Sequence, residues 1–187
     1  HRDPDVSAAS ICYSPDGAST YIGSQDGRIY NWNAQTSQLI EVLQCRVTDV
    51  ARKVNPQQEI HESVMDLAID ESADRMLVVR HQSNGHAVTV WNLKSGQEGT
   101  EVRFVQGTRP HASFLKGQRD ILIGNSEGLE IVSPDLRILR RKLNLFGNVY
   151  QSSPDGRAVV GVNSAGDLEL WSLRNGKLLA TGDRVGQ

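Results

Sequence analysis

The sequence predicts an all-β protein in which four copies of a small antiparallel sheet follow one another along the chain. In the clearest copy, residues 148–181, the turn signals Ser153-Pro154-Asp155-Gly156 and Asn175-Gly176 divide runs of β-favouring residues into four strands. These four strands are expected at 148–152, 158–163, 167–172 and 177–181. One such sheet cannot bury both of its faces, so it must stack against others.

The copies recur with a period of about 40 residues, which is typical of propeller blades. The turn that begins at Ser14 precedes Trp32 at the same spacing as the turn that begins at Ser153 precedes Trp171. Trp91 precedes Trp171 by two such periods, and Val132 takes the tryptophan position of the copy between them. Four blades, each a four-stranded sheet, are therefore predicted at about 6–44, 62–105, 108–143 and 147–182, arranged radially.

Two segments carry a resemblance to a known family. Cys12-Tyr13-Ser14-Pro15-Asp16-Gly17 and the stretch from Gly23 to Trp32-Asn33 resemble the repeats of WD-repeat β-propellers. The repeats depart from that pattern because no tryptophan precedes an aspartate, the usual Gly-His pair is missing, and the third repeat lacks both its tryptophan and its Pro-Asp. The resemblance implies that 1–187 is one β-propeller segment with an insertion at 45–61. It also implies a larger ring of about seven blades, completed by further chain before His1 or after Gln187, or by a second copy.

The resemblance also assigns structural roles. Trp32, Trp91 and Trp171 are expected to pack between blades on the third strand of each sheet. Asp26 matches the aspartate that braces a blade by hydrogen bonding from a tight turn, and His61 stands near the position of the family's structural histidine.

Two departures from the period point to a binding face. Trp32 and Trp91 are separated by much more than one period, and part of the excess is a long connection at 45–60. In the second repeat, the first turn also lies three residues farther from its tryptophan, Trp91, than in the other repeats. These extra residues predict a widened hairpin loop at 81–86, between strands at 75–80 and 87–92. In WD-like blades, the loops between the second and third strands open on one face of the ring, and the connections from the fourth strand to the next blade open on that same face. Lengthened loops on a rigid scaffold are common sites of recognition.

We therefore predict that this face binds a protein or peptide partner and that the chain is a scaffold. The candidate binding residues are His81, His86, Arg109 and Phe146, the last two adding a cation and an aromatic anchor. The alternative for the two insertions is tolerated variation of surface loops.

No catalytic motif is present. The sequence has no phosphate-binding G-x-x-x-x-G-K-[ST], no G-x-S-x-G, no H-E-x-x-H and no C-x-x-C. His81 and His86 have no cysteine or carboxylate cluster near them in the sequence, so neither a metal site nor a cofactor is expected. A non-enzymatic role is predicted. The alternative is the propeller portion of a larger enzyme, either regulatory or with catalytic residues in the channel or in a further part of the chain.

The composition limits the classes of partner that the chain is expected to bind. With 20 basic and 22 acidic residues the chain is nearly neutral, which gives no indication of specific nucleic-acid or membrane binding. Four basic residues crowd the expected last strand of the third blade, where they either protect an exposed sheet edge or dock an acidic partner: Arg137, Arg140, Arg141 and Lys142. No apolar run is long enough to span a bilayer. Two unpatterned cysteines suggest a reducing compartment, and a cytoplasmic location is expected.

Overall fold

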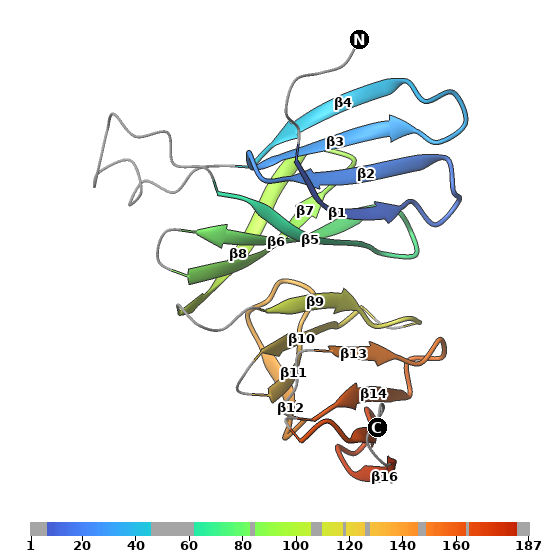
Figure 1. The fold of residues 1–187 in the computed structure, drawn as a ribbon, viewed down its shortest axis with the longest axis vertical. Coiled ribbons are helices and arrows are strands. Elements are labelled where there is room, and N and C mark those ends of the chain that lie inside the picture. Colours follow the sequence, from blue (N-terminus) through green and yellow to red (C-terminus); the bar gives the residue numbers. More distant parts are fainter. Residues whose placement is uncertain are drawn as a thin grey trace. The chain divides into compact units, whose positions relative to one another are not determined.

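The computed structural model describes residues 7–45, 62–82, 85–105, 110–117, 119–125, 128–145, 149–163 and 165–182. These residues form strands β1 to β16 in four four-stranded antiparallel sheets, and no helix occurs among them (Figure 1). The predicted all-β fold of four four-stranded blades is confirmed. The connection 46–61 lies outside the described residues.

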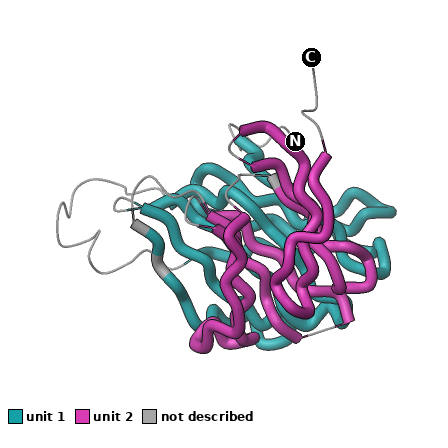
Figure 2. Tube along the Cα trace, turned by 90° about the horizontal axis from the view of Figure 1, so that it is seen from below, with its two compact units in different colours: residues 1–106 teal, residues 107–187 magenta. Residues whose placement is uncertain are grey.

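The chain divides into two compact units, residues 1–106 and 107–187, coloured separately in Figure 2. Unit 1 holds two sheets, each with its strands in sequential order. Blade 1 consists of β1 (Ala8–Tyr13), β2 (Ser19–Ser24), β3 (Arg28–Asn33) and β4 (Leu39–Gln44). Blade 2 consists of β5 (Val64–Ile69), β6 (Arg75–Gln82), β7 (Gly85–Asn92) and β8 (Gln97–Val105).

Unit 2 repeats this arrangement. Blade 3 consists of β9 (His111–Phe114), β10 (Ile121–Asn125), β11 (Gly128–Val132) and β12 (Leu139–Leu143). Blade 4 consists of β13 (Val149–Ser152), β14 (Ala158–Val162), β15 (Leu168–Ser172) and β16 (Leu178–Gly182). Every blade is thus built from four strands that are consecutive in the sequence.

The Ser-Pro-Asp-Gly segments form the turns between the first and second strands. In blade 1 the Ser14 hydroxyl donates to the Asp16 carboxylate at 2.6 Å, and the same carboxylate accepts the backbone N–H of Ala18 at 3.0 Å. These bonds lower the pKa of Asp16, the Ser14 bond most strongly. Blade 4 repeats the contact between Ser153 and Asp155, also at 2.6 Å. A short polar side chain that satisfies local backbone groups explains why these residues make the turn.

In each unit the two blades pack face to face around an apolar core. The core of unit 1 lies between blades 1 and 2 and includes Ile29, Leu43, Val64, Met76 and Trp91. The core of unit 2 includes Leu122, Leu129, Leu143, Tyr150 and Val159, and the half-buried Trp171 packs against it.

A glycine in the second strand of one blade admits the first strand of the next. A Cβ on Gly23 would lie 2.4 Å from a methyl group of Val64, and a Cβ on Gly124 would lie 2.0 Å from the ring of Tyr150. In unit 2 the Tyr150 hydroxyl also donates to the backbone carbonyl of His111 at 2.6 Å. These positions therefore need glycine for close packing between blades, since any side chain there would collide with the neighbouring strand.

The tryptophans occupy corresponding positions in their blades and differ in how far they are buried. Trp91 is 3% exposed and belongs to the core between blades 1 and 2. Trp32 lies opposite Thr20, which lies opposite the exposed Tyr13, so these residues share the face of blade 1 that points away from blade 2. Cys12, the neighbour of Tyr13, packs on the core side. The packing role of Trp32 against another blade therefore stays a prediction.

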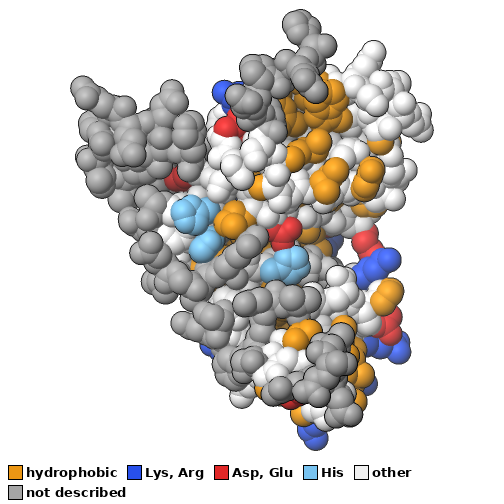
Figure 3. Space-filling view, viewed as in Figure 1, with side chains coloured by type: hydrophobic (Ala, Val, Ile, Leu, Met, Phe, Trp, Pro, Cys, Tyr) orange, Lys and Arg blue, Asp and Glu red, His pale blue; other side chains and the backbone are white. Residues whose placement is uncertain are grey.

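The outermost strand of each sheet differs in character. In β4, Leu39, Ile40 and Val42 are exposed, and in β16 Leu178 and Leu179 are exposed. Figure 3 shows hydrophobic side chains at the surface of the part formed by β1 to β4. In β12, which has the sequence LRRKL, Leu139 is also exposed, but the cations that follow it pair with neighbouring acids: Arg140 approaches Asp120 at 3.7 Å and Lys142 approaches Glu130 at 3.5 Å.

Candidate binding surface

The predicted binding face corresponds to one end of blade 2. The antiparallel register brings the start of β5, the β6–β7 hairpin and the end of β8 together there, since Val64 pairs with Arg80 and Gly85 with Val105. The backbone N–H of His81 donates to the carbonyl of Ser63 at 2.8 Å, which joins the hairpin to the residues before β5. We call this part of the molecule, residues 62–63, 81–82 and 85–86, the hairpin end of blade 2.

The two residues that flank the connection 46–61 meet at one turn of blade 1. The backbone N–H of Cys45 donates to the carbonyl of Gly27 at 3.3 Å. A Cβ on Gly27 would lie 2.7 Å from the carbonyl oxygen of Glu62. Both anchors are buried, Cys45 at 2% and Glu62 at 3% exposed. The connection therefore begins and ends at the same place, and its anchors are fixed.

Asp26 holds the turn at which these anchors meet. Its carboxylate accepts the backbone N–H of Arg28 at 3.1 Å and the hydroxyl of Tyr30 at 3.2 Å. The Arg28 guanidinium lies 3.6 Å away on the exposed side. These are contacts of the bracing kind that the family resemblance implies for Asp26.

Asp26→Ala is expected to lower the free energy of unfolding by about 1–2 kcal/mol, because two hydrogen bonds are lost and the buried Tyr30 hydroxyl loses an acceptor. Chemical denaturation measures this change. Asp26→Asn keeps an acceptor oxygen and should cost less than the alanine variant. Equal losses in the two variants would show that charge, and not hydrogen bonding, is what Asp26 contributes.

The prediction of a widened loop at 81–86 is wrong. β6 and β7 continue to Gln82 and Gly85, and His81 pairs with His86 across the strands. The extra residues thus lengthen the hairpin strands, which have eight residues each, compared with six in blade 1. The rings of His81 and His86 meet edge to face with their centres 5.2 Å apart. The two candidate histidines are therefore together, on paired strands.

The other candidate binding residues cannot be placed. Arg109 and Phe146 lie outside the described residues, as does His61. The binding roles of His81, His86, Arg109 and Phe146 all stay predictions.

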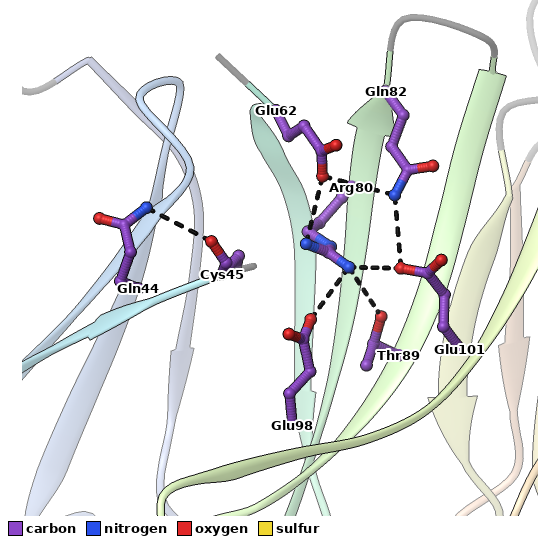
Figure 4. A network of polar contacts seen from close by, with 8 residues as sticks. All are labelled: Gln44, Cys45, Glu62, Arg80, Gln82, Thr89, Glu98 and Glu101. Carbon is purple, nitrogen blue, oxygen red and sulfur yellow. Dashed lines mark hydrogen bonds and ion pairs between the residues drawn. The ribbon is translucent and has the colours of Figure 1, made fainter. Parts of the chain in front are cut away.

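Beneath the hairpin end lies a buried charge network that sequence reasoning missed. Arg80, 1% exposed, is surrounded by side chains from the segment before β5 and from β6, β7 and β8 (Figure 4). Its guanidinium lies 3.2 Å from Glu62, 2.9 Å from Glu98 and 2.5 Å from Glu101. The remaining bonds run from Arg80 to the hydroxyl of Thr89 at 3.3 Å, and from the Gln82 amide to Glu62 at 3.4 Å and to Glu101 at 3.3 Å.

Strand alternation places this network on the core side of blade 2. Arg80 follows Val78, a core residue, by two positions, so both point toward blade 1. The same alternation was visible in the sequence, where the apolar positions 76 and 78 continue into Arg80 and Gln82. A cation at an inward position was the signal that a buried partner must exist. Its three acidic partners could not be identified from the sequence alone.

The thiol of Cys45, which lies near this network, has a pKa shifted mainly by its burial. Burial raises the pKa of Cys45 to about 12; among the smaller effects, Arg80 lowers the pKa, and Glu98 and Glu62 raise it. Burial likewise raises the pKa of Cys12 to about 12, with Asp66 adding to the effect. Both thiols are therefore protonated at neutral pH and are poor nucleophiles.

Two further features of the described residues bear on function. No group of three or more His, Cys, Asp or Glu side chains in this part of the chain is arranged to hold a metal ion. No helix there is long and apolar enough to cross a membrane.

Comparison with known proteins supports the fold. Neither the known protein families nor the curated proteins give a match to the sequence. Among solved structures, the chain is similar to the β-propeller domain of Cps50 (Swd1) from Myceliophteria thermophila, with a TM-score of 0.77 and 13% sequence identity. The match covers 97% of this chain and 56% of that one, so this chain spans little more than half of its length. At this identity the likeness establishes the fold, a β-propeller segment of four blades with WD-like repeats.

Proposed function

We propose that the chain is a non-catalytic scaffold that binds a protein or peptide partner at the hairpin end of blade 2. β-propellers with WD-like repeats typically mediate protein interactions, and the four-bladed segment is of this type. Fold alone does not fix function, so the proposal depends on the local structure of this one end.

The observation that carries the proposal is the shared anchor of the connection 46–61. Cys45 and Glu62 meet at Gly27, so the intervening residues are presented from fixed, adjacent points. The Arg80 network holds the second anchor through the Glu62 carboxylate. A long segment with adjacent ends on a rigid support is an arrangement common in recognition sites.

The histidine pair adds a contact surface beside these anchors. The His81 side chain is exposed and that of His86 is partly exposed. Aromatic rings on paired strands contribute contact area with little loss of conformational entropy on binding. Arg109 and Phe146 remain candidates for partner binding by their positions in the repeats.

The test is a set of variants compared for partner binding. Residues 46–60 are replaced by a short Gly-Ser connection, and His81→Ala is made separately. Proteins captured by the parent chain are identified, and their affinities for each variant are measured. We expect the loop replacement to weaken binding by at least about tenfold, which is about 1.4 kcal/mol.

The matched control lies at the opposite end of blade 2. Lys94, in the turn between β7 and β8, is exposed and forms a surface ion pair with Asp74 at 2.8 Å. Lys94→Ala should leave affinity unchanged. If the loop replacement and His81→Ala also bind with parental affinity, the partner site is elsewhere, and the basic strand β12 becomes the surface to test.

A further inference from the structure

The geometry of the paired histidines points to a second property of the hairpin end of blade 2. We propose that His81 and His86 form a two-ligand site for Zn²⁺. This inference does not depend on the proposed partner binding. It follows from the position of the pair in the hairpin and from the separation of the two rings.

The backbone register favours close side chains at this pair. The N–H of His81 is directed to Ser63 on the β5 side, at 2.8 Å, and not to His86. His81 and His86 are therefore a non-hydrogen-bonded antiparallel pair. Side chains are closest at such pairs, with Cβ atoms about 4.5–5.5 Å apart.

The ring separation agrees with a tetrahedral zinc ion. A zinc–nitrogen bond is about 2.0–2.1 Å, and an imidazole centre lies about 1.2 Å beyond its nitrogen, so two imidazoles on one tetrahedral ion have centres about 5.2 Å apart. The observed separation is 5.2 Å. The interplanar angle of 77° is compatible with this, because each ring can rotate about its own zinc–nitrogen bond.

The strands beneath the pair are held by polar contacts, and one of the two rings is exposed. Adjacent residues of a strand point to opposite faces, so the histidines lie on the face of blade 2 opposite to Arg80 and Gln82. Those two side chains are held by Glu62 and Glu101, which limits movement of the hairpin. His81 is exposed, and Figure 3 shows histidine side chains at the molecular surface. Two protein ligands leave two of the four positions on zinc for water or for a donor from a bound molecule.

The experiment is a titration of the metal-free chain with Zn²⁺, followed by calorimetry and by thermal unfolding. His1 and His61 are first replaced by alanine in every protein, so that binding by these residues cannot contribute. We expect one Zn²⁺ per chain and a rise in Tm with Zn²⁺ concentration, because a ligand that binds the folded state stabilises it. Mg²⁺ prefers oxygen ligands and should produce neither effect.

Single variants then assign the site. His81→Ala and His86→Ala should each weaken Zn²⁺ binding by at least the roughly 10–100-fold that loss of an outer-shell partner costs. His111→Ala is the matched control, since His111 lies in unit 2 with its ring against Tyr150. It should bind Zn²⁺ as the parent does. Circular dichroism confirms that each variant is folded.

Two results would overturn the assignment. One is a parent chain with no Zn²⁺ binding, in which case the contact between the rings is packing alone. The other is Zn²⁺ binding that is unchanged in folded His81→Ala and His86→Ala, which would place the metal on other residues.

Discussion

Arg80→Met is expected to lower the free energy of unfolding by about 3–5 kcal/mol, because it removes the partner cation from buried carboxylates. The three acids around Arg80 have little access to water: the side chains of Glu62, Glu98 and Glu101 are 2%, 8% and 20% exposed. Methionine fills a similar volume, so the change removes charge and hydrogen bonds with little loss of packing. Urea denaturation followed by circular dichroism measures the effect.

Two further variants test whether unpaired buried charge is the cause of this loss of stability. Arg140→Met removes a half-exposed guanidinium that lies 3.7 Å from Asp120, and it should cost less than about 1 kcal/mol. Adding Glu62→Gln and Glu101→Gln to Arg80→Met should recover part of the loss, because it removes unpaired charges. If the triple variant is no more stable than Arg80→Met alone, repulsion among the acids is not the cause of the destabilisation.

Trp91→Ala is expected to cost about 3–5 kcal/mol, because a large side chain is removed from the core between blades 1 and 2. Trp91→Phe should cost much less. The indole N–H of Trp91 has no acceptor among the described residues, so phenylalanine loses no hydrogen bond there. The measurement is again the free energy of unfolding.

Trp32→Ala is the matched comparison for Trp91→Ala. Trp32 occupies the corresponding place in blade 1, but it is only partly buried and belongs to neither core cluster. Its truncation should cost clearly less in this chain. A loss as large as that of Trp91→Ala would show that the outer face of blade 1 is covered in solution.

The blades were predictable because their signals are local. The turn bonds between Ser14 and Asp16, and between Ser153 and Asp155, join residues two positions apart and recur with the repeat. A pattern that repeats in this way can be read without knowing which strands meet. The tryptophan spacing supplied the register of the blades for the same reason.

The site was harder to predict because its contacts are distant in sequence. Arg80 reaches Glu62 across 18 positions and Glu101 across 21, and nothing local distinguishes these acids from the chain's other carboxylates. The segment from His81 to His86 contains Asn84-Gly85, a turn dipeptide, which favoured a loop over the whole stretch. Pairing of the histidines depends on cross-strand contacts and on the bond from His81 to residue 63, which residue propensities do not contain.

The contrast between the outer strands has a consequence for colloidal behaviour. β4 and β16 present leucine, isoleucine and valine to solvent, whereas β12 combines one exposed leucine, Leu139, with three cations. An apolar strand edge accepts another strand readily, and flanking charges prevent this. Concentrated solutions of the chain should therefore associate more readily through β4 and β16 than through β12. The substitution Leu179→Lys would suppress association through β16 without touching the core of either unit.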